Sequence, residues 1–140
     1  MPTTYVTRRE RFSAAHRLFR KDFSDEENYE TFGNCSHENW HGHNFELFVT
    51  IKGEVNPDMG FVVNLKTISK LIKTLVIDKL DHKNINVDVD FMKGKLASTE
   101  NLAISIWNEL EQPIKRLNAE LHRVKINETE NNSVEYYGGK

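Results

Sequence analysis

The chain of 140 residues is poor in cysteine, in long hydrophobic runs and in charge of one sign. Its single cysteine, Cys35, cannot form an internal disulfide, which excludes a disulfide-stabilised secreted domain and favours a reducing compartment. The apolar runs are too short to span a bilayer, and residues 1–12 lack the apolar core of a secretory signal. Charges nearly balance, with 19 Lys and Arg against 21 Asp and Glu, so no strong overall positive field favours a nucleic-acid backbone. We therefore expect a cytoplasmic protein whose partners are neither membranes nor nucleic acids.

The sequence does contain enough residues for one domain, a modest hydrophobic core and several histidines. No repeat, low-complexity tract or linker divides the chain, so a single domain is expected over residues 1–140. Only 38% of the residues are hydrophobic, which is low for a compact domain. Six histidines around a single thiol are the second unusual feature.

Alternating hydrophobic residues predict two long strands near the N-terminus. In residues 4–16, Val6, Phe12 and Ala14 share one face, which indicates a half-exposed strand. Residues 43–54 alternate more clearly, since one face is formed by Phe45, Leu47, Val49 and Ile51. Residues 17–40 between these strands are expected to form a loop, with at most a turn or two of helix in the acidic stretch.

Turn residues predict two hairpins. Asn56 to Gly60 have the composition of a turn, and a short strand over residues 61–63 is expected to follow and complete a hairpin. Residues 121–128 and 133–137 predict a second antiparallel hairpin at the C-terminus.

Between the hairpins the hydrophobic period becomes helical. Asn64 is a suitable N-cap for a helix that ends near residues 78–80 and has an apolar stripe of Leu65, Ile68, Leu71, Ile72 and Leu75. A second helix is expected to begin at Ser98, and Pro113 to kink or restart it. This order predicts an α+β fold, a four-stranded antiparallel sheet with two helices on one face.

The pair His41 and His43 begins the clearest strand. Residues i and i+2 of a strand point to the same side, so both imidazoles can reach one ion. His16, at the end of the other N-terminal strand, is the leading candidate for a third ligand, and three imidazoles with an open fourth position are typical of catalytic zinc. The alternative is a polar strand end that makes only hydrogen bonds.

Cys35 lies in a polar loop six residues before His41. A lone cysteine is usually a small buried apolar residue. Here the nearby histidines, or a metal ion, favour a lowered pKa and a thiolate that acts as a base or nucleophile. A third alternative makes Cys35 the fourth zinc ligand, which would close the site and make it structural.

Three further groups have weaker signals. Asp81 next to His82 is a common arrangement for a proton relay, although such surface pairs are frequent. Glu128 is expected to point inward near a strand end, where it pairs either with a basic residue or with the two N–H donors of a 2-amino-pyrimidinone. Ser98, Thr99 and Glu100 are explained as a helix start that can also contact a ligand. His37 and His122 are expected to be solvated.

Together these residues resemble the 6-pyruvoyl tetrahydropterin synthase family over nearly the full length of the chain. The resemblance depends on six segments that occur in the family's order. They are Phe12 to Leu18, Ser24 to Asn28 with Phe32 to Cys35, His41 to Asn44, Leu80 to Asn84, Ser98 to Asn101, and Glu128 to Asn132.

The resemblance implies a zinc-dependent lyase that converts 7,8-dihydroneopterin triphosphate to 6-pyruvoyl tetrahydropterin with loss of triphosphate. It implies Zn²⁺ on His16, His41 and His43, Cys35 as the proton-abstracting base, and Asp81 with His82 as the proton relay. Glu128 corresponds to the pterin anchor, and the substrate-binding group also includes Ser98, Thr99 and Glu100. The implied fold is the tunnelling fold, in which subunits join their sheets into an oligomeric barrel, typically a homohexamer built as a dimer of trimers.

The chain departs from the family pattern between Cys35 and His41. The insert differs from the Asn-Pro-Asn-Gly type of animal members, and His37 and Trp40 in it can change the polarity of the pocket. The gap is longer than in relatives that make 6-carboxytetrahydropterin for the queuosine and deazapurine pathway, which favours the pyruvoyl product. Two alternatives to the pyruvoyl-forming lyase remain. One is the carboxy-forming activity, and the other is a non-catalytic zinc-stabilised module. Cys35 itself argues against relatives that have Glu at this position and cleave the side chain differently.

Overall fold

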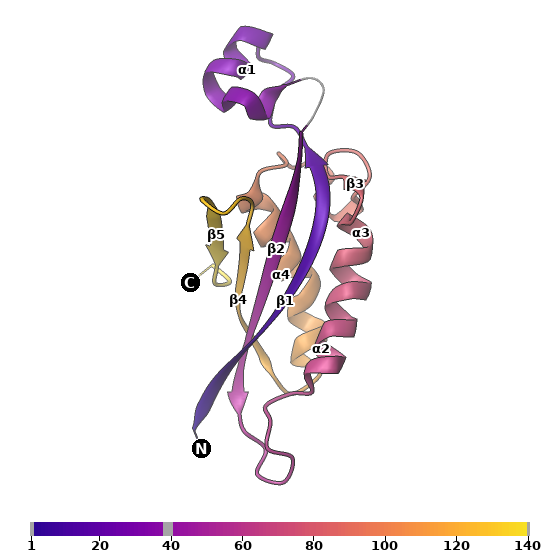
Figure 1. Cartoon of the computed structure of the whole chain (residues 1–140), viewed down its shortest axis with the longest axis vertical. Coiled ribbons are helices and arrows are strands. Elements are labelled where there is room, and N and C mark those ends of the chain that lie inside the picture. Colours follow the sequence, from indigo (N-terminus) through magenta and orange to yellow (C-terminus); the bar gives the residue numbers. More distant parts are fainter. Residues whose placement is uncertain (1, 38–40, 140) are drawn as a thin grey trace.

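The computed structural model describes residues 2–37 and 41–139, and of His41 it describes only the backbone. One five-stranded sheet with the order β3-β1-β2-β4-β5 is the framework (Figure 1). Its strands are β1 Thr3–His16, β2 His41–Glu54, β3 Lys83–Asn84, β4 Glu120–Asn127 and β5 Ser133–Tyr136. The α-helices are α1 Asp25–Phe32, α2 Leu65–Ile72, α3 Asp78–Leu80 and α4 Thr99–Lys115. A π-helical segment η2, Lys73–Ile77, connects α2 to α3, and 3-10 turns form at η1 Gly33–Ser36 and η3 Asp90–Met92.

The two N-terminal strands form the longest ladder of the sheet. β1 and β2 pair antiparallel from Thr3 opposite Glu54 to His16 opposite His41. The predicted alternation is confirmed, because Phe12, Phe45 and the remaining hydrophobic residues of the inner face of β2 are buried. This ladder brings the end of β1 and the start of β2 together, where the predicted metal ligands lie.

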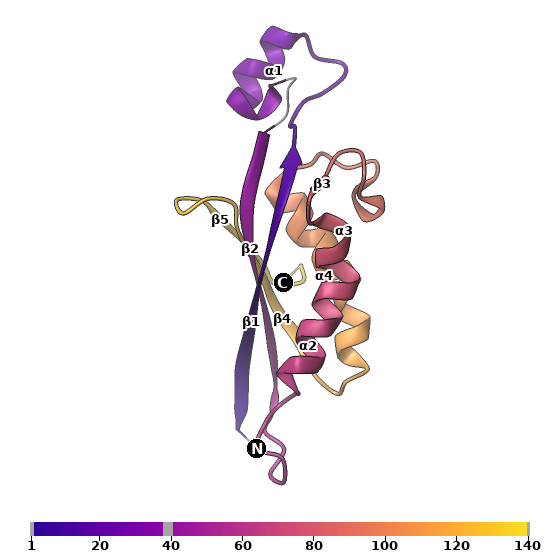
Figure 2. The same ribbon diagram turned by 45° about the vertical axis from the view of Figure 1, so that its right-hand side comes forward.

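The helices cover one face of the sheet, as Figure 2 shows. Both predicted N-caps are confirmed: the Asn64 side chain accepts a hydrogen bond from Lys66 N, and Ser98 accepts one from Asn101 N. The prediction that Pro113 restarts the second helix is wrong, since α4 continues to Lys115. Pro113 lies in the last turn, so its missing N–H removes one hydrogen bond close to the helix end, and only two helical residues follow it. None of the helices in the described part of the chain is both long and apolar enough to cross a bilayer.

The predicted four-stranded antiparallel sheet is corrected to a five-stranded mixed sheet. The added strand β3 has only two residues and pairs parallel to β1, with Lys83 beside Ala14 and Asn84 beside Ala15. Two polar residues have no hydrophobic alternation, so a pattern-based prediction has no signal for them. The sheet of this chain is open, and the oligomeric barrel remains a prediction.

The predicted strand over residues 61–63 is also wrong, because this segment forms bends. Both sides of β2 are already occupied, by β1 on one side and by β4 on the other. With β2 paired on both sides, the segment folds back over Gly53, where an added Cβ would come within 2.6 Å of Val62 Cγ1.

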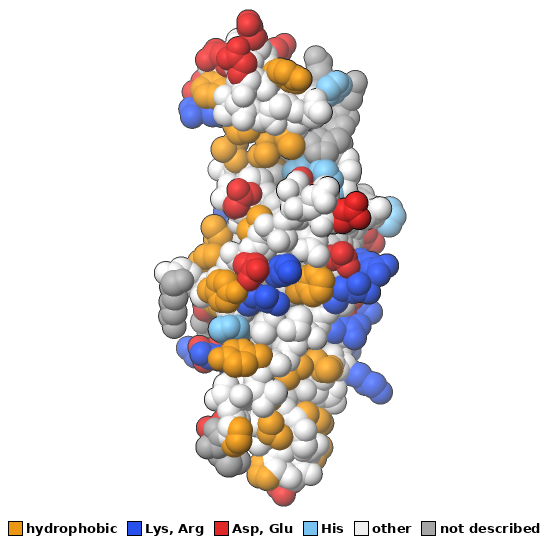
Figure 3. All heavy atoms as spheres, turned by 60° about the vertical axis from the view of Figure 1, so that its left-hand side comes forward, with side chains coloured by type: hydrophobic (Ala, Val, Ile, Leu, Met, Phe, Trp, Pro, Cys, Tyr) orange, Lys and Arg blue, Asp and Glu red, His pale blue; other side chains and the backbone are white. Residues whose placement is uncertain are grey.

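Helix α1 projects beyond the end of the sheet (Figure 1). Its eight residues make about the two turns that were predicted. Ser24 and Glu27 form a complete capping box at its start, and its first turn is acidic. Acidic side chains gather at this end of the molecule in Figure 3, whereas basic and hydrophobic side chains mix across the middle of the face shown. η1 follows α1 directly, and the N–H of Leu18 donates to Cys35 O at 2.6 Å. This hydrogen bond holds the thiol-bearing turn near the end of β1.

Candidate active site and metal centre

His16 is the last residue of β1, and its ring is buried with 1% of the residue exposed. Its Nδ1 lies 2.7 Å from Ala97 O. Because a carbonyl oxygen can only accept, Nδ1 carries the proton of this hydrogen bond, so Nε2 is the ring nitrogen that can act as a metal ligand. The backbone before α4 therefore orients the ring in the way that a metal-binding histidine requires.

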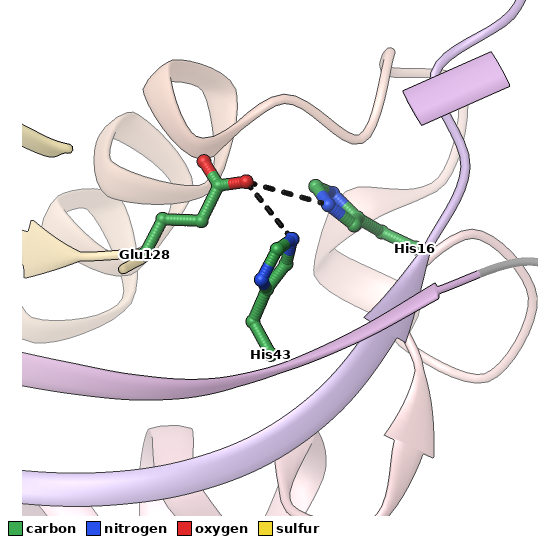
Figure 4. A group of neighbouring side chains, drawn as sticks. All are labelled: His16, His43 and Glu128. Atoms are coloured by element: carbon green, nitrogen blue, oxygen red, sulfur yellow. Dashed lines mark ion pairs between the residues drawn. The ribbon is translucent and has the colours of Figure 1, made fainter. Parts of the chain in front are cut away.

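His43 and Glu128 meet His16 at this end of the sheet (Figure 4). Glu128 Oε1 lies 3.0 Å from His43 Nε2 and 3.8 Å from His16 Nε2. One ligand atom from each of the three residues falls within 4.8 Å of the others. Burial lowers the pKa of His43 more than the Glu128 carboxylate raises it, which favours the neutral imidazole that binds metals.

These side chains fit a divalent transition metal. Two imidazole nitrogens and a carboxylate oxygen are a common zinc donor set, and the hydrogen bond of His16 Nδ1 supplies the expected outer support. The remaining predicted ligand, His41, stands opposite His16 in the ladder, but its side chain lies outside what the structure describes. The three-histidine set thus remains a prediction, whereas Glu128 joins the histidines in the structure.

Glu128 points inward as predicted. Among the described residues its partners are the two histidines and Thr99, and no Lys or Arg of the structural alternative pairs with it. Thr99 Oγ1 donates to Glu128 Oε2 at 2.7 Å and is buried. Of its neighbours in the predicted substrate group, Ser98 caps α4, and Glu100 is exposed on the first turn.

Cys35 is half-buried in η1. Burial raises the pKa of its thiol, and the negative charge of Glu128 raises it further. The expectation that nearby protein groups lower this pKa is therefore wrong for the residues described. The carboxylate of Glu128, which sequence reasoning did not connect with the thiol, is the second cause.

The pair Asp81 and His82 forms as predicted, beside β1. Asp81 Oδ1 accepts a hydrogen bond from Ser13 N at 2.9 Å, and Asp81 Oδ2 lies 3.1 Å from His82 Nδ1. The hydrogen bond from Ser13, followed by the contact with His82, lowers the pKa of Asp81. The His82 side chain is 83% exposed and lines, with His43, a hollow of about 510 Å³. The carboxylate is thus fixed on β1, and the imidazole has access to solvent and to this hollow.

The two histidines without a predicted role lie elsewhere. His122 packs between Tyr5 and Tyr137, with ring centroids 4.7 and 5.5 Å away, so it is not simply solvated. His37 is exposed at the end of η1. The remaining residues of the unusual insert, 38–40, which include Trp40, lie outside the described residues.

The fold and the site together define a class, an α+β protein with a candidate metal centre where the ends of β1, β2 and β4 meet the start of α4. Residues 5–139 match the sequence model of the family described as 6-pyruvoyl tetrahydropterin synthase. The chain is 47% identical over 136 residues to the 6-pyruvoyl tetrahydrobiopterin synthase of Dictyostelium discoideum, with 97% of each chain covered. It is 43% identical over 133 residues to the enzyme of that name from Homo sapiens, with 95% of this chain and 90% of the relative covered.

The solved structure of 6-pyruvoyl tetrahydropterin synthase from Caenorhabditis elegans superposes with a TM-score of 0.91 at 40% identity. The superposition covers 99% of this chain and 98% of that one. A weaker match, 32% identity over 63% of this chain, is a putative 6-carboxy-5,6,7,8-tetrahydropterin synthase of Archaeoglobus fulgidus. The chain belongs to the 6-pyruvoyl tetrahydropterin synthase family, and it is an enzyme, a lyase of that type.

Proposed function

We propose that this protein converts 7,8-dihydroneopterin triphosphate to 6-pyruvoyl tetrahydropterin and triphosphate, a step in tetrahydrobiopterin synthesis. The observation that carries the proposal is the convergence of His16, His43 and Glu128 at one end of the sheet. It occurs in a chain that matches the family over residues 5–139.

His16, His41 and His43 would hold a zinc ion. When bound, zinc supplies Lewis-acid chemistry at the oxygens of the substrate side chain, which makes the neighbouring C–H bonds more acidic. The protein's contribution is to fix the ligands. Ala97 O orients the ring of His16, and the β1–β2 ladder sets the backbones of the other two histidines relative to it.

Glu128 would anchor the pterin ring. A carboxylate can accept two parallel hydrogen bonds from the amino group and the ring N–H of a 2-amino-pyrimidinone. Thr99 already fixes one of its oxygens, and the helix start with Ser98 and Glu100 lies beside it in sequence. This arrangement selects a flat heterocycle with two adjacent donors.

Cys35, Asp81 and His82 would move the protons. Cys35 removes a proton from a side-chain carbon, and the electron pair of that C–H bond expels triphosphate as the C–O bond breaks. Asp81 orients and balances the charge of His82, whose exposed ring exchanges protons with solvent and completes the shift along the side chain. Because burial raises the pKa of Cys35, this step needs positive charge near the thiol in the working site.

The test is incubation of the purified protein with 7,8-dihydroneopterin triphosphate and identification of the product by mass. We expect the pyruvoyl compound and free triphosphate. The 6-carboxytetrahydropterin product would favour the alternative activity. The match to a putative enzyme of that type covers only 63% of this chain, so it supports this alternative less well than the full-length matches support the pyruvoyl product. No product from zinc-loaded protein would favour a non-catalytic zinc-stabilised module.

We also propose that the protein acts as a homohexamer in the cytoplasm. In the single chain the outer edge of β5 and most of the outer edge of β1 have no neighbouring strand among the described residues. Joining such edges between subunits protects them from nonspecific pairing with other chains. Light scattering of the purified protein would give the mass. A monomer at micromolar concentration would contradict the assembly.

A further inference from the structure

Thr99, the first residue of α4, holds a buried hydroxyl against the carboxylate of the candidate site. Only 4% of the residue is exposed, and Oγ1 donates to Glu128 Oε2 at 2.7 Å. The other oxygen, Oε1, faces the imidazoles of His43 and His16. The hydroxyl therefore distinguishes the two oxygens of Glu128.

The segment that contains Thr99 also orients His16. Ala97 O, two residues earlier, accepts the hydrogen bond from His16 Nδ1. Two hydrogen bonds of Asn101 fix this short segment: its N–H donates to Ser98 Oγ at 3.1 Å, and its Nδ2 donates to Leu96 O at 3.0 Å. Buried Leu102 anchors the helix behind it. The start of α4 is thus a rigid support that contacts both sides of the site.

A glutamate carboxylate needs such a support, because its terminal torsion is broad and has no sharply preferred angle. Each oxygen has two acceptor positions, so Oε2 can hold the Thr99 hydroxyl and still accept from a ligand. With the hydroxyl in place, the plane of the carboxylate is set before a ligand arrives. Without it, the carboxylate is free to rotate toward the histidines.

We propose that Thr99 is a positioning residue that sets the orientation of the Glu128 carboxylate for pterin binding. The proposal rests on the proposed function in one respect, namely that Glu128 is the group that binds the pterin. Thr99 acts through Glu128 and does not itself react.

The experiment compares Thr99→Val, which keeps the shape and removes the donor, with Thr99→Ser, which keeps the donor. Thr50→Val is the matched control, because Thr50 is also buried and hydrogen-bonded but belongs to the opposite half of β2. The readouts are the dissociation constant of neopterin from its fluorescence, KM and kcat for dihydroneopterin triphosphate, and zinc affinity by chelator competition. Melting temperatures check the fold of each variant.

We expect Thr99→Val to weaken neopterin binding about tenfold or more, the effect of a lost hydrogen bond to a charged group. KM rises in parallel and kcat changes less. Thr99→Ser and Thr50→Val stay within about twofold of the unmodified protein. Zinc affinity stays within about threefold in every variant, because the hydrogen bond of His16 to Ala97 is untouched.

Two results would overturn the positioning role: unchanged neopterin binding in Thr99→Val, or equal losses in Thr99→Val and Thr99→Ser. Loss of zinc in Thr99→Val would overturn it too, because Glu128 would then act on the metal. The proposed function fails separately. If the unmodified protein forms no product while the neopterin affinities follow the expected order, the positioning role stands and the reaction is wrong.

Discussion

Replacing Cys35 by alanine separates the proposed role of the thiol from its alternatives. The substitution removes Sγ from η1 and leaves Cys35 O, which accepts from Leu18 N, in place. The main-chain contact between η1 and the end of β1 is therefore kept. Any loss of activity then reports on the thiol itself.

The structural and catalytic costs of this change differ widely. Sγ is about the size of one methylene and is only half-buried, so its removal costs about 0.5 kcal/mol of folding free energy. A general base contributes about 10² to 10⁴ in rate, which corresponds to about 2.7–5.5 kcal/mol of activation free energy. We therefore expect Cys35→Ala to keep its fold and its zinc stoichiometry while product formation falls at least a hundredfold.

The assay follows product by mass, zinc content by atomic emission and unfolding in urea on the same preparations. Cys35→Ser is the control for size. We expect it to be nearly as inactive, since a hydroxyl is a far weaker acid than a thiol. Loss of stoichiometric zinc from Cys35→Ala would make the thiol a ligand and the site closed. Activity within tenfold of the unmodified enzyme would refute its role as base.

Further predictions concern the relay, the core, the C-terminus and the metal. The hydrogen bond from Ser13 lowers the pKa of Asp81, so its stabilisation is complete above about pH 4 and is lost as the pH falls through the folded-state pKa. Asp81→Asn should therefore lower the free energy of unfolding in urea by about 0.5–1 kcal/mol near neutral pH and have almost no effect in strong acid. Ile106→Ala removes a fully buried α4 side chain and should cost about 2–5 kcal/mol in the same assay. Gly138 has a φ of +81°, and an added Cβ would lie 2.5 Å from Trp107 Cζ2, so Gly138→Ala should displace the C-terminus and shift indole fluorescence to the red. Chelation of zinc should abolish activity while circular dichroism stays native, whereas a structural zinc site would unfold.

Local patterns were sufficient where one element determines its own structure. The alternation around Phe45 predicted β2, and the caps Asn64 and Ser98 marked both helix starts. Local patterns were insufficient where the pairing of strands depends on distant parts of the chain. β3 exists because Lys83 lies beside Ala14, and residues 61–63 are not a strand because β2 has no free edge.

The same division applies to the site. Strand spacing predicted that His43 points to the same side as His41 with His16 close by, and strand parity predicted that Glu128 points inward. The structure brings His16, His43 and Glu128 together. The contact between Thr99 and Glu128, and the hydrogen bond from His16 to Ala97, join residues 29 and 81 positions apart. No local pattern encodes such contacts. The raised pKa of Cys35 has the same origin, because it depends on how deeply η1 is buried and on Glu128.

The hydrophobic core and the candidate metal centre depend on the same strand register. The rings of Phe12 and Phe45 stack across the β1–β2 ladder with centroids 4.9 Å apart, which fixes the pairing four residues from His16. The ring of Phe45 also packs edge-on against both His16 and His43. A slip of one residue would turn every side chain of β1 to the opposite face, so it would expose Phe12 and carry His16 away from His43 together. The core residues therefore stabilise the fold and also select the single register in which the two histidines can share an ion.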